Sequence, residues 1–101
     1  MEKTVRRIEQ SPIYQGEDEE IYYTVDTSTW GGSPSSVSVV VKQNGDDVSE
    51  TLLTRSASVN GDVITLPKIA DLVDGTHYRL EVKFTSSGNI IEAWAELIGQ
   101  K

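Results

Sequence analysis

Apolar and polar residues alternate along much of the chain with a period of two. The run over residues 77–84 is the clearest, since every second position is apolar and the positions between are His, Arg, Glu and Lys. Its apolar members are Tyr78, Leu80, Val82 and Phe84. Because successive side chains of a strand point to opposite faces, this run predicts a strand with one apolar face and one charged face.

Residues 90–98 are predicted to be the hairpin partner of that strand. The intervening Ser86-Ser87-Gly88-Asn89 offers turn residues, of which Gly88 and Asn89 tolerate a positive φ. The predicted inward face consists of Ile91, Ala93, Ala95 and Leu97. Alanine and glutamate in this segment also fit a helix, but the β-branched start and the preceding turn favour a strand.

The rest of the chain predicts shorter strands joined by turns. The expected strands cover residues 4–9, 20–25, 37–42, 48–53, 57–59 and 63–66, and the pattern is weakest in 48–53. The pairs Asn44-Gly45 and Asn60-Gly61 are strong hairpin signals. Pro12 is expected to end the first strand or to kink it at a sheet edge. Residues 68–73 are expected to form a single helical turn.

Together these elements predict an all-β fold, a sandwich of about seven antiparallel strands. The chain has 101 residues, of which 37% are hydrophobic and 25% charged. That size and composition suit one domain spanning residues 1–101, which can bury a core without metal or disulfide support.

Residues 72–82 resemble the tyrosine-corner region of fibronectin type III and related immunoglobulin-like sandwiches. Leu72 is followed by Gly75, and Gly75 by Tyr78 at the start of the best strand. The resemblance implies that Leu72 closes the end of the core and that Gly75 turns the crossover. It also implies that the Tyr78 ring is buried while its hydroxyl bonds to the crossover backbone. The alternative is a loop–strand junction in another β-fold, such as a small barrel.

The charge of the chain excludes two classes of partner. Lys and Arg total 9 against 16 Asp and Glu, for a net charge of -7. Such a surface repels nucleic acid and anionic membranes. Cysteine is absent, which removes disulfides and thiolate chemistry and leaves the cellular compartment unknown. Neither a signal peptide nor a membrane span is visible, and Met1 suggests a complete protein, although an excised domain can also begin with an added Met.

No catalytic constellation can be written from the sequence, so no enzyme and no cofactor are predicted. His77 is the only histidine, and it falls on the polar face of the best strand without an evident nucleophile. Carboxylates gather at Glu17-Asp18-Glu19-Glu20 and at Asp46-Asp47. They lack the spacing of a calcium loop, so solvated turn carboxylates are favoured over a Ca²⁺ site.

Three aromatic residues are candidate contacts for a protein partner. Trp94 shares a face with Glu92 and Glu96, which predicts partial exposure, with Tyr22 as a possible neighbour. The alternative is that Trp94 covers the sheet or packs under the N-terminal segment. Trp30 precedes Gly31-Gly32, and we favour a plug at one end of the core over a loop contact.

Three short motifs are similar to those of small immunoglobulin-like proteins of tailed phages and prophages, of the head–tail or fibre–tail adaptor kind. They are Thr27-Ser28-Thr29-Trp30, Gly75-Thr76-His77-Tyr78 and Thr85-Ser86-Ser87-Gly88. Residues 92–97 are richer in alanine than the last strand of that family, and the acidic run at Glu17 is not typical of it.

The resemblance implies a non-catalytic virion component that is made in the cytoplasm, binds protein and can form a homo-oligomer within an assembly. The alternative is an extracellular or cell-surface module that binds protein or carbohydrate. Neighbouring genes would distinguish the two, since capsid, portal or tail genes would support the first.

Overall fold

A long hairpin forms the centre of the larger of two β layers. In this computed structural model, which describes residues 5–7 and 11–101, β10 spans His77–Ser86 and β11 spans Asn89–Gln100. The two strands pair without interruption from His77↔Ile98 to Ser86↔Asn89. Ser87 and Gly88 form the turn with φ of 50° and 80°, and two positive φ values are the geometry of a type I′ hairpin turn.

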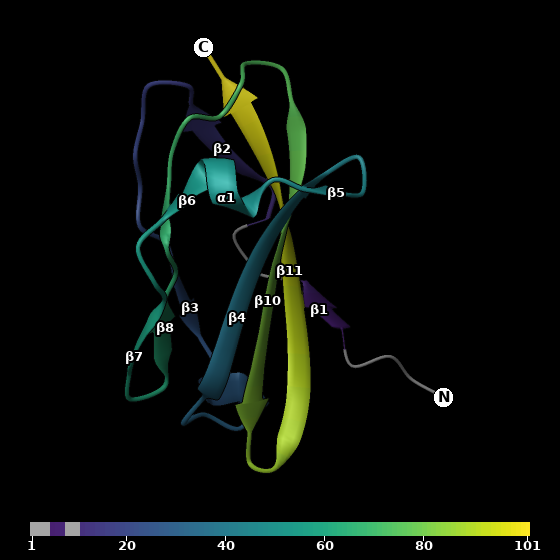
Figure 1. The fold of residues 1–101 in the computed structure, drawn as a ribbon. Coiled ribbons are helices and arrows are strands. Elements are labelled where there is room, and N and C mark those ends of the chain that lie inside the picture. Colours follow the sequence, from purple (N-terminus) through teal and green to yellow (C-terminus); the bar gives the residue numbers. More distant parts are fainter. Residues whose placement is uncertain (1–4, 8–10) are drawn as a thin grey trace.

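The other strands of the larger sheet flank this hairpin. On one side, β4 (Ser35–Gln43) pairs with β10, and the Asn44-Gly45 turn leads into β5 (Asp46–Asp47), as the sequence predicted. On the other side, β1 (Val5–Arg7) and β2 (Ile13–Gly16) both pair with β11, and both run parallel to it. Figure 1 shows these strands as one twisted layer.

The opposite layer is built from short strands. β3 (Thr24–Asp26), β8 (Val63–Thr65) and β7 (Ser58–Asn60) form one sheet in that order. β6 (Leu53–Thr54) and β9 (Lys68–Ile69) form a second pair, which an Ile21–Ile69 bridge connects to the segment entering β3. Two short helical turns occur among the described residues, η1 (Ser28–Trp30) and α1 (Ser49–Leu52).

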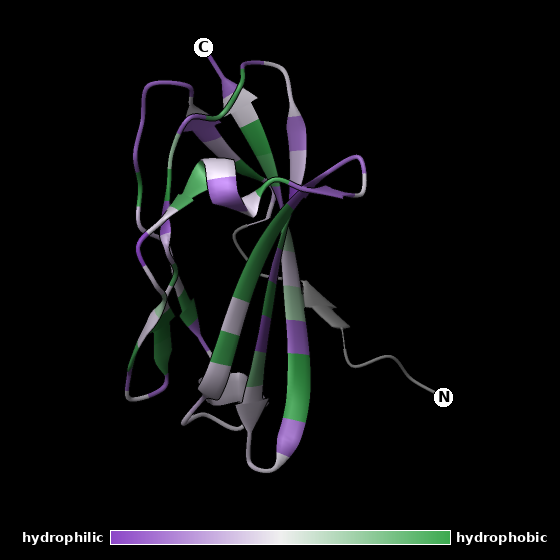
Figure 2. Cartoon of the chain, in the orientation of Figure 1, coloured by the Kyte–Doolittle hydropathy of each residue, from purple (hydrophilic) through white to green (hydrophobic). Residues whose placement is uncertain are grey.

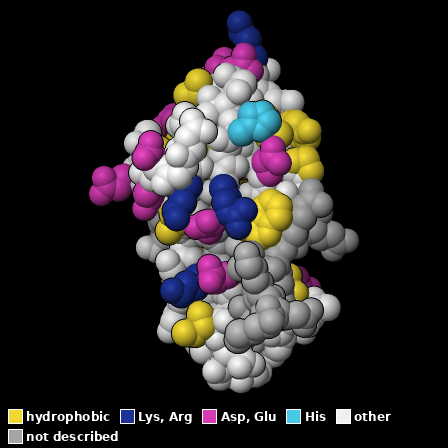
Figure 3. Space-filling model, turned by 90° about the vertical axis from the view of Figure 1, so that its right-hand side faces the viewer, with side chains coloured by type: hydrophobic (Ala, Val, Ile, Leu, Met, Phe, Trp, Pro, Cys, Tyr) yellow, Lys and Arg dark blue, Asp and Glu magenta, His cyan; other side chains and the backbone are white. Residues whose placement is uncertain are grey.

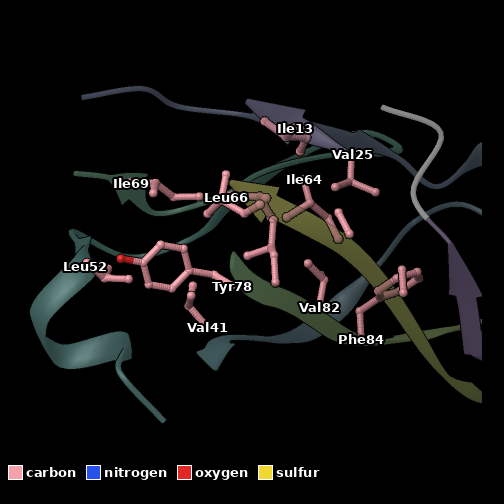
Figure 4. Packing of buried hydrophobic residues seen from close by; sticks show 14 of the residues in the cluster. Ile13, Val25, Val41, Leu52, Ile64, Leu66, Ile69, Tyr78, Val82 and Phe84 are labelled. Atoms are coloured by element: carbon pink, nitrogen blue, oxygen red, sulfur yellow. The ribbon is translucent and has the colours of Figure 1, made fainter. Parts of the chain in front are cut away.

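The core lies between the two layers because alternate residues of each strand point inward. Figure 2 shows the resulting alternation of hydrophobic and hydrophilic positions along β10 and β11. Figure 4 shows Tyr78 beside Leu52 at one end of the core cluster and Phe84 at the other. The predicted inward residues of β10 and β11 are all buried, and they are Tyr78, Leu80, Val82, Phe84, Ile91, Ala93, Ala95 and Leu97.

The crossover into β10 brings three backbone segments together. The buried Tyr78 hydroxyl accepts a hydrogen bond from the Val73 N–H at 3.0 Å, and Leu72 is buried beside it. Gly75 has a φ of 79°, which its missing side chain permits, and its N–H donates to the Gly99 carbonyl at 2.9 Å. The crossover is thereby tied both to β10 and to the end of β11.

The fold is an all-β immunoglobulin-like sandwich, which confirms the predicted class, but three local predictions need correction. Residues 68–73 do not form a helical turn, because Ile69 exchanges two backbone hydrogen bonds with Ile21 and is held extended. Residues 48–53 are mostly α1 rather than a strand, because the Leu52 N–H donates to the Val48 carbonyl. Finally, the pairings of β1 and β2 are parallel, whereas the sequence predicted antiparallel strands throughout.

Strands β1 and β2, which come before and after Pro12 in the chain, both lie along the β11 edge of the larger sheet. Within the predicted strand at 4–9, residues 5–7 form β1, and the remaining positions lie outside the described residues. Strand β2 was not predicted. It begins just after Pro12 and continues along the same edge of β11.

Candidate functional site

Trp94 projects from the outer face of the larger sheet. Its neighbours Ala93 and Ala95 are buried, so the alternation of β11 directs Trp94 outward, where it is half-buried. The guanidinium carbon of Arg79 lies 4.6 Å from the centre of the indole ring. Arg79 reaches the ring diagonally from β10, because Glu81 is the residue directly opposite Trp94.

Ion pairs on the neighbouring strands orient this cation. Arg79 Nε lies 2.9 Å from Glu81 Oε2, and Lys42 Nζ lies 3.5 Å from Glu81 Oε1. We call Lys42, His77, Arg79, Glu81, Trp94 and Glu96 the Trp94 face. Figure 3 shows acidic and basic side chains interleaved with hydrophobic ones on this side, below the histidine.

The ion pairs of the Trp94 face order its side chains more than they stabilise the fold. The side chains of Arg79 and Glu81 remain 46% and 33% exposed, and exposed pairs contribute only about 0 to 1 kcal/mol each. A cation over an indole at an exposed site adds about 0.5 to 1 kcal/mol. The result is an aromatic ring that lies under an oriented guanidinium on an otherwise charged sheet.

Trp30 lies at the far end of the core from the Tyr78 crossover. It is the last residue of η1, packs against the core cluster, and stacks on Phe84 with ring centres 6.2 Å apart. The buried Ser86 hydroxyl donates to the Gly32 carbonyl at 2.5 Å and fixes the loop after η1. Trp30 therefore occupies the position of an end plug, and any role in contacting a partner stays a prediction.

Tyr22 belongs to the opposite layer from Trp94. It is 46% exposed, and Lys68 Nζ lies 5.7 Å from its ring centre. Lys68 also pairs with Glu20 at 3.0 Å. The three aromatic candidates therefore occupy three separate places: the outer face of the larger sheet, one end of the core, and the segment that enters β3.

A pocket of about 200 Å³ opens beside Tyr22, between the edges of the two layers. It is lined by Ile13, Tyr22, Tyr23, Thr24, Val25, Leu66 and Leu80. The Tyr23 hydroxyl donates to Gln15 Oε1 at 2.8 Å, and burial, followed by the charge of Glu19, raises the pKa of this phenol. This pocket could not be predicted from the sequence, because it depends on β2 lying opposite β3.

Gln15 is a second feature that the sequence did not reveal. Its side chain is fully buried, and its amide nitrogen donates to the carbonyls of Ile69 at 2.8 Å and Glu19 at 3.0 Å. One glutamine thus ties β2 of the larger sheet to β9 of the other layer. Its inward direction depends on Ile69, which lies 54 residues away along the chain.

The titratable side chains form no catalytic arrangement among residues 11–101. His77 Nδ1 lies 2.9 Å from Glu96 Oε1 on the exposed sheet surface. Turn carboxylates accept structural hydrogen bonds, since Asp47 accepts one from the nearby Ser49 N–H and Asp62 accepts one from the distant Ser33 N–H. Within the described residues, no three acidic or histidine side chains gather as a metal site requires, and no helix is long and apolar enough to cross a membrane.

Comparison with known proteins adds only structural neighbours. No family model matches the chain, and no curated protein matches its sequence. A chimeric titin Z1Z2 functionalised with a KLER peptide from decorin is 18% identical, with a TM-score of 0.48 over 89% of this chain and 86% of that one. The titin M1 domain is 14% identical (TM-score 0.46, covering 94% and 87%), and the titin M3 domain is 14% identical (TM-score 0.47, covering 96% and 90%).

Proposed function

We propose that the chain is a non-catalytic structural domain that binds another protein through the Trp94 face. The observation that supports this proposal is the partly exposed indole of Trp94, held 4.6 Å from a guanidinium that is itself paired with Glu81. Trp and Arg are the residue types most enriched where binding energy concentrates. Because Arg79 is already oriented, a partner that docks here loses less side-chain entropy on binding.

A phage or prophage virion component is the finer form of this proposal. Its support is the order of the three motifs that begin at Thr27, Gly75 and Thr85. At one end of the core, Ser86 of the third motif bonds to Gly32 in the loop that follows the first motif, and the second motif forms the crossover at the other end. Since all three motifs help to close the ends of the sandwich, they are stronger support for this fold than for a phage origin. Neighbouring genes for capsid, portal or tail proteins are the expected finding, and metabolic neighbours would contradict it.

The alternative function, carbohydrate binding, would also depend on the indole ring of Trp94. A sugar would have to stack on the indole, and Arg79 already occupies the stacking position on one face of it. We therefore favour a protein partner. A glycan array probed with the wild-type chain and with Trp94→Ala tests this choice, and a glycan retained only by the wild type would reverse it.

A matched pair of variants tests the protein interface. Trp94→Ala removes the indole, whereas Val73→Ala removes an exposed apolar side chain from the crossover, where Val73 is 60% exposed. Partners captured by the immobilised chain would be purified and their affinities measured by calorimetry. We expect Trp94→Ala to weaken binding at least about tenfold and Val73→Ala to have little effect. The proposal would be contradicted if a partner bound the two variants with equal affinity. It would also be contradicted if a partner bound both variants as tightly as it binds the wild type.

A further inference from the structure

Strand β3 leaves one edge of its sheet unpaired. The Leu66 N–H donates to the Tyr23 carbonyl and the Thr27 N–H donates to the Asp62 carbonyl, each at 2.8 Å. In an antiparallel pair, backbone groups alternate between the two sides of a strand, so Tyr23, Val25 and Thr27 face β8. The N–H and C=O groups of Tyr22, Thr24 and Asp26 therefore face away from β8, where the described part of the chain places no strand.

The pocket of about 200 Å³ lies directly beside this edge. Its floor includes the buried Leu66 and Leu80, and its rim includes Tyr22 and Thr24 of the unpaired edge. Figure 4 shows Ile13 and Val25, which line it from the two layers, lying near each other above Leu66 and Ile64. An apolar cavity of about 150 Å³ is large enough to bind a benzene ring, so this pocket can hold one large apolar side chain.

The charge around the edge selects a basic occupant. The residues entering it are Glu17, Asp18, Glu19 and Glu20, and Asp26 lies at its far end. Lys68, the cation beside Tyr22, is already paired with Glu20 at 3.0 Å. The segment from Ile21 to Asp26 also contains none of the lysines or prolines that commonly protect an open edge.

From these three features we propose that β3 accepts an extended, basic segment of a partner protein as an added strand. The backbone of the segment pairs with Tyr22, Thr24 and Asp26. One inward apolar side chain fills the pocket, and the alternate outward side chains are Lys or Arg near Asp26 and the acidic residues at 17–20. This surface lies on the layer opposite the Trp94 face, so the inference goes beyond the proposed function and neither depends on the other.

A synthetic peptide of alternating basic and apolar residues is the probe: acetyl-Lys-Val-Lys-Leu-Lys-Val-Lys-amide. Titrated into the full isotope-labelled chain, it should shift the amide resonances of Tyr22, Thr24 and Asp26 and slow their hydrogen exchange. Its affinity should fall with added salt, because the charges are exposed. A peptide with Glu in place of every Lys should bind at least about tenfold more weakly.

Two matched proline variants locate the strand. Thr24→Pro removes an outward N–H to which the described residues offer no backbone acceptor, and Val59→Pro does the same at the outer edge of β7, on the other side of the same sheet. We expect Thr24→Pro to weaken binding at least about tenfold and Val59→Pro to leave it within about twofold. Should Thr24→Pro fail to fold, the wild-type chain with a peptide N-methylated on alternate residues gives the same test, since methylation also removes the edge hydrogen bonds.

Several results would overturn the inference. The first is the absence of resonance shifts at about 1 mM peptide, and the second is shifts on the Trp94 face instead of β3. The third is equal binding of the Glu peptide. The fourth is equal binding of two peptides that are N-methylated on alternate residues, one on the odd positions and one on the even positions. Loss of binding by Trp94→Ala in the earlier experiment leaves this result unchanged, so the two proposals fail separately.

Discussion

The two ends of the sandwich are closed by different means. At the crossover end, backbone is tied to backbone: Gly75 donates to the Gly99 carbonyl, Gly99 donates to the Thr76 carbonyl, and the Tyr78 hydroxyl adds one side-chain bond. At the opposite end, more of the closing contacts come from side chains: the Trp30 ring stacks on Phe84, and the Ser86 hydroxyl donates to the Gly32 carbonyl. At Gly99 the first end has no room for a side chain, because backbone lies against it, whereas the second end depends more on contacts between side chains.

Gly99→Ala should be the most damaging single change at the crossover end. A Cβ at Gly99 would lie 2.2 Å from the Val73 carbonyl oxygen, and backbone cannot swing aside as a side chain can. We expect a loss of about 3 kcal/mol in the free energy of unfolding, measured by urea denaturation. Gly45→Ala is the control, since its Cβ would meet nothing within 4 Å at a φ of 86°, and it should cost only about 1 kcal/mol. Equal losses in the two variants would show that the close approach at Gly99 is unimportant.

Trp30→Ala should be the most damaging change at the other end. The ring packs against the core cluster but is only half-buried, so we expect a loss of about 2 kcal/mol, below the value for a fully buried tryptophan. Trp94→Ala should cost less, because Trp94 stands on the outer face of the sheet. Thermal and urea unfolding of both variants would check the order. A larger loss for Trp94→Ala would mean that Trp30 does not close the core.

The single hydrogen bonds at the two ends should have similar and independent effects. Tyr78→Phe leaves the Val73 N–H without its acceptor, and Ser86→Ala leaves the Gly32 carbonyl without its donor. Each should cost about 1 kcal/mol. The two residues lie about 27 Å apart along β10, at about 3.4 Å per residue, so the double variant should show the sum of the two losses. A clear departure from additivity in denaturation experiments would show that the two ends are coupled.

The same contrast explains which parts of the fold could be predicted. The β10–β11 hairpin and its inward face were predicted because the period of two and the turn are local properties of the chain. Leu72, Gly75 and Tyr78 also lie within one short segment. Gly99, which the crossover requires, could not be recognised, because its role depends on a segment more than twenty residues away.

Strand β2 was not predicted because Gln15 interrupts the expected pattern. A polar residue between Tyr14 and Gly16 suggests an exposed loop, yet Gln15 is fully buried, with its amide bonded to Ile69 and Glu19 and to the Tyr23 hydroxyl. The partial exposure of Trp94 could be predicted from the alternation of β11, but the position of Arg79 over its ring depends on the register of β10 against β11. The expected neighbourhood of Trp94 and Tyr22 was wrong, since the two residues belong to different layers.

The smallest expected effect is an acid dependence shared by the two ends. Asp26, just before η1, accepts a hydrogen bond from the Ser28 N–H, and this bond lowers the pKa of its carboxyl. Asp47, just before α1, accepts bonds from the Ser49 hydroxyl and N–H, which lower its pKa in the same way. In both cases the unfolded chain binds a proton more readily than the folded one.

The sign of the effect follows from these lowered pKa values. The stabilisation by each carboxylate is fully present above the ordinary aspartate pKa of about 3.9 and is lost as the pH falls through the lower folded pKa. Asp26→Asn and Asp47→Asn should therefore be slightly less stable than the wild type near neutral pH, and the differences should vanish in strong acid. Asp46→Asn is the control, because the described chain offers the Asp46 carboxylate no hydrogen-bond donor. Melting temperatures measured across this pH range check the prediction. If the difference in melting temperature between each Asn variant and the wild type stayed constant with pH, the hydrogen bonds from Ser28 and Ser49 would not distinguish the charged from the neutral carboxyl. These helical turns would then be held by their backbone bonds alone.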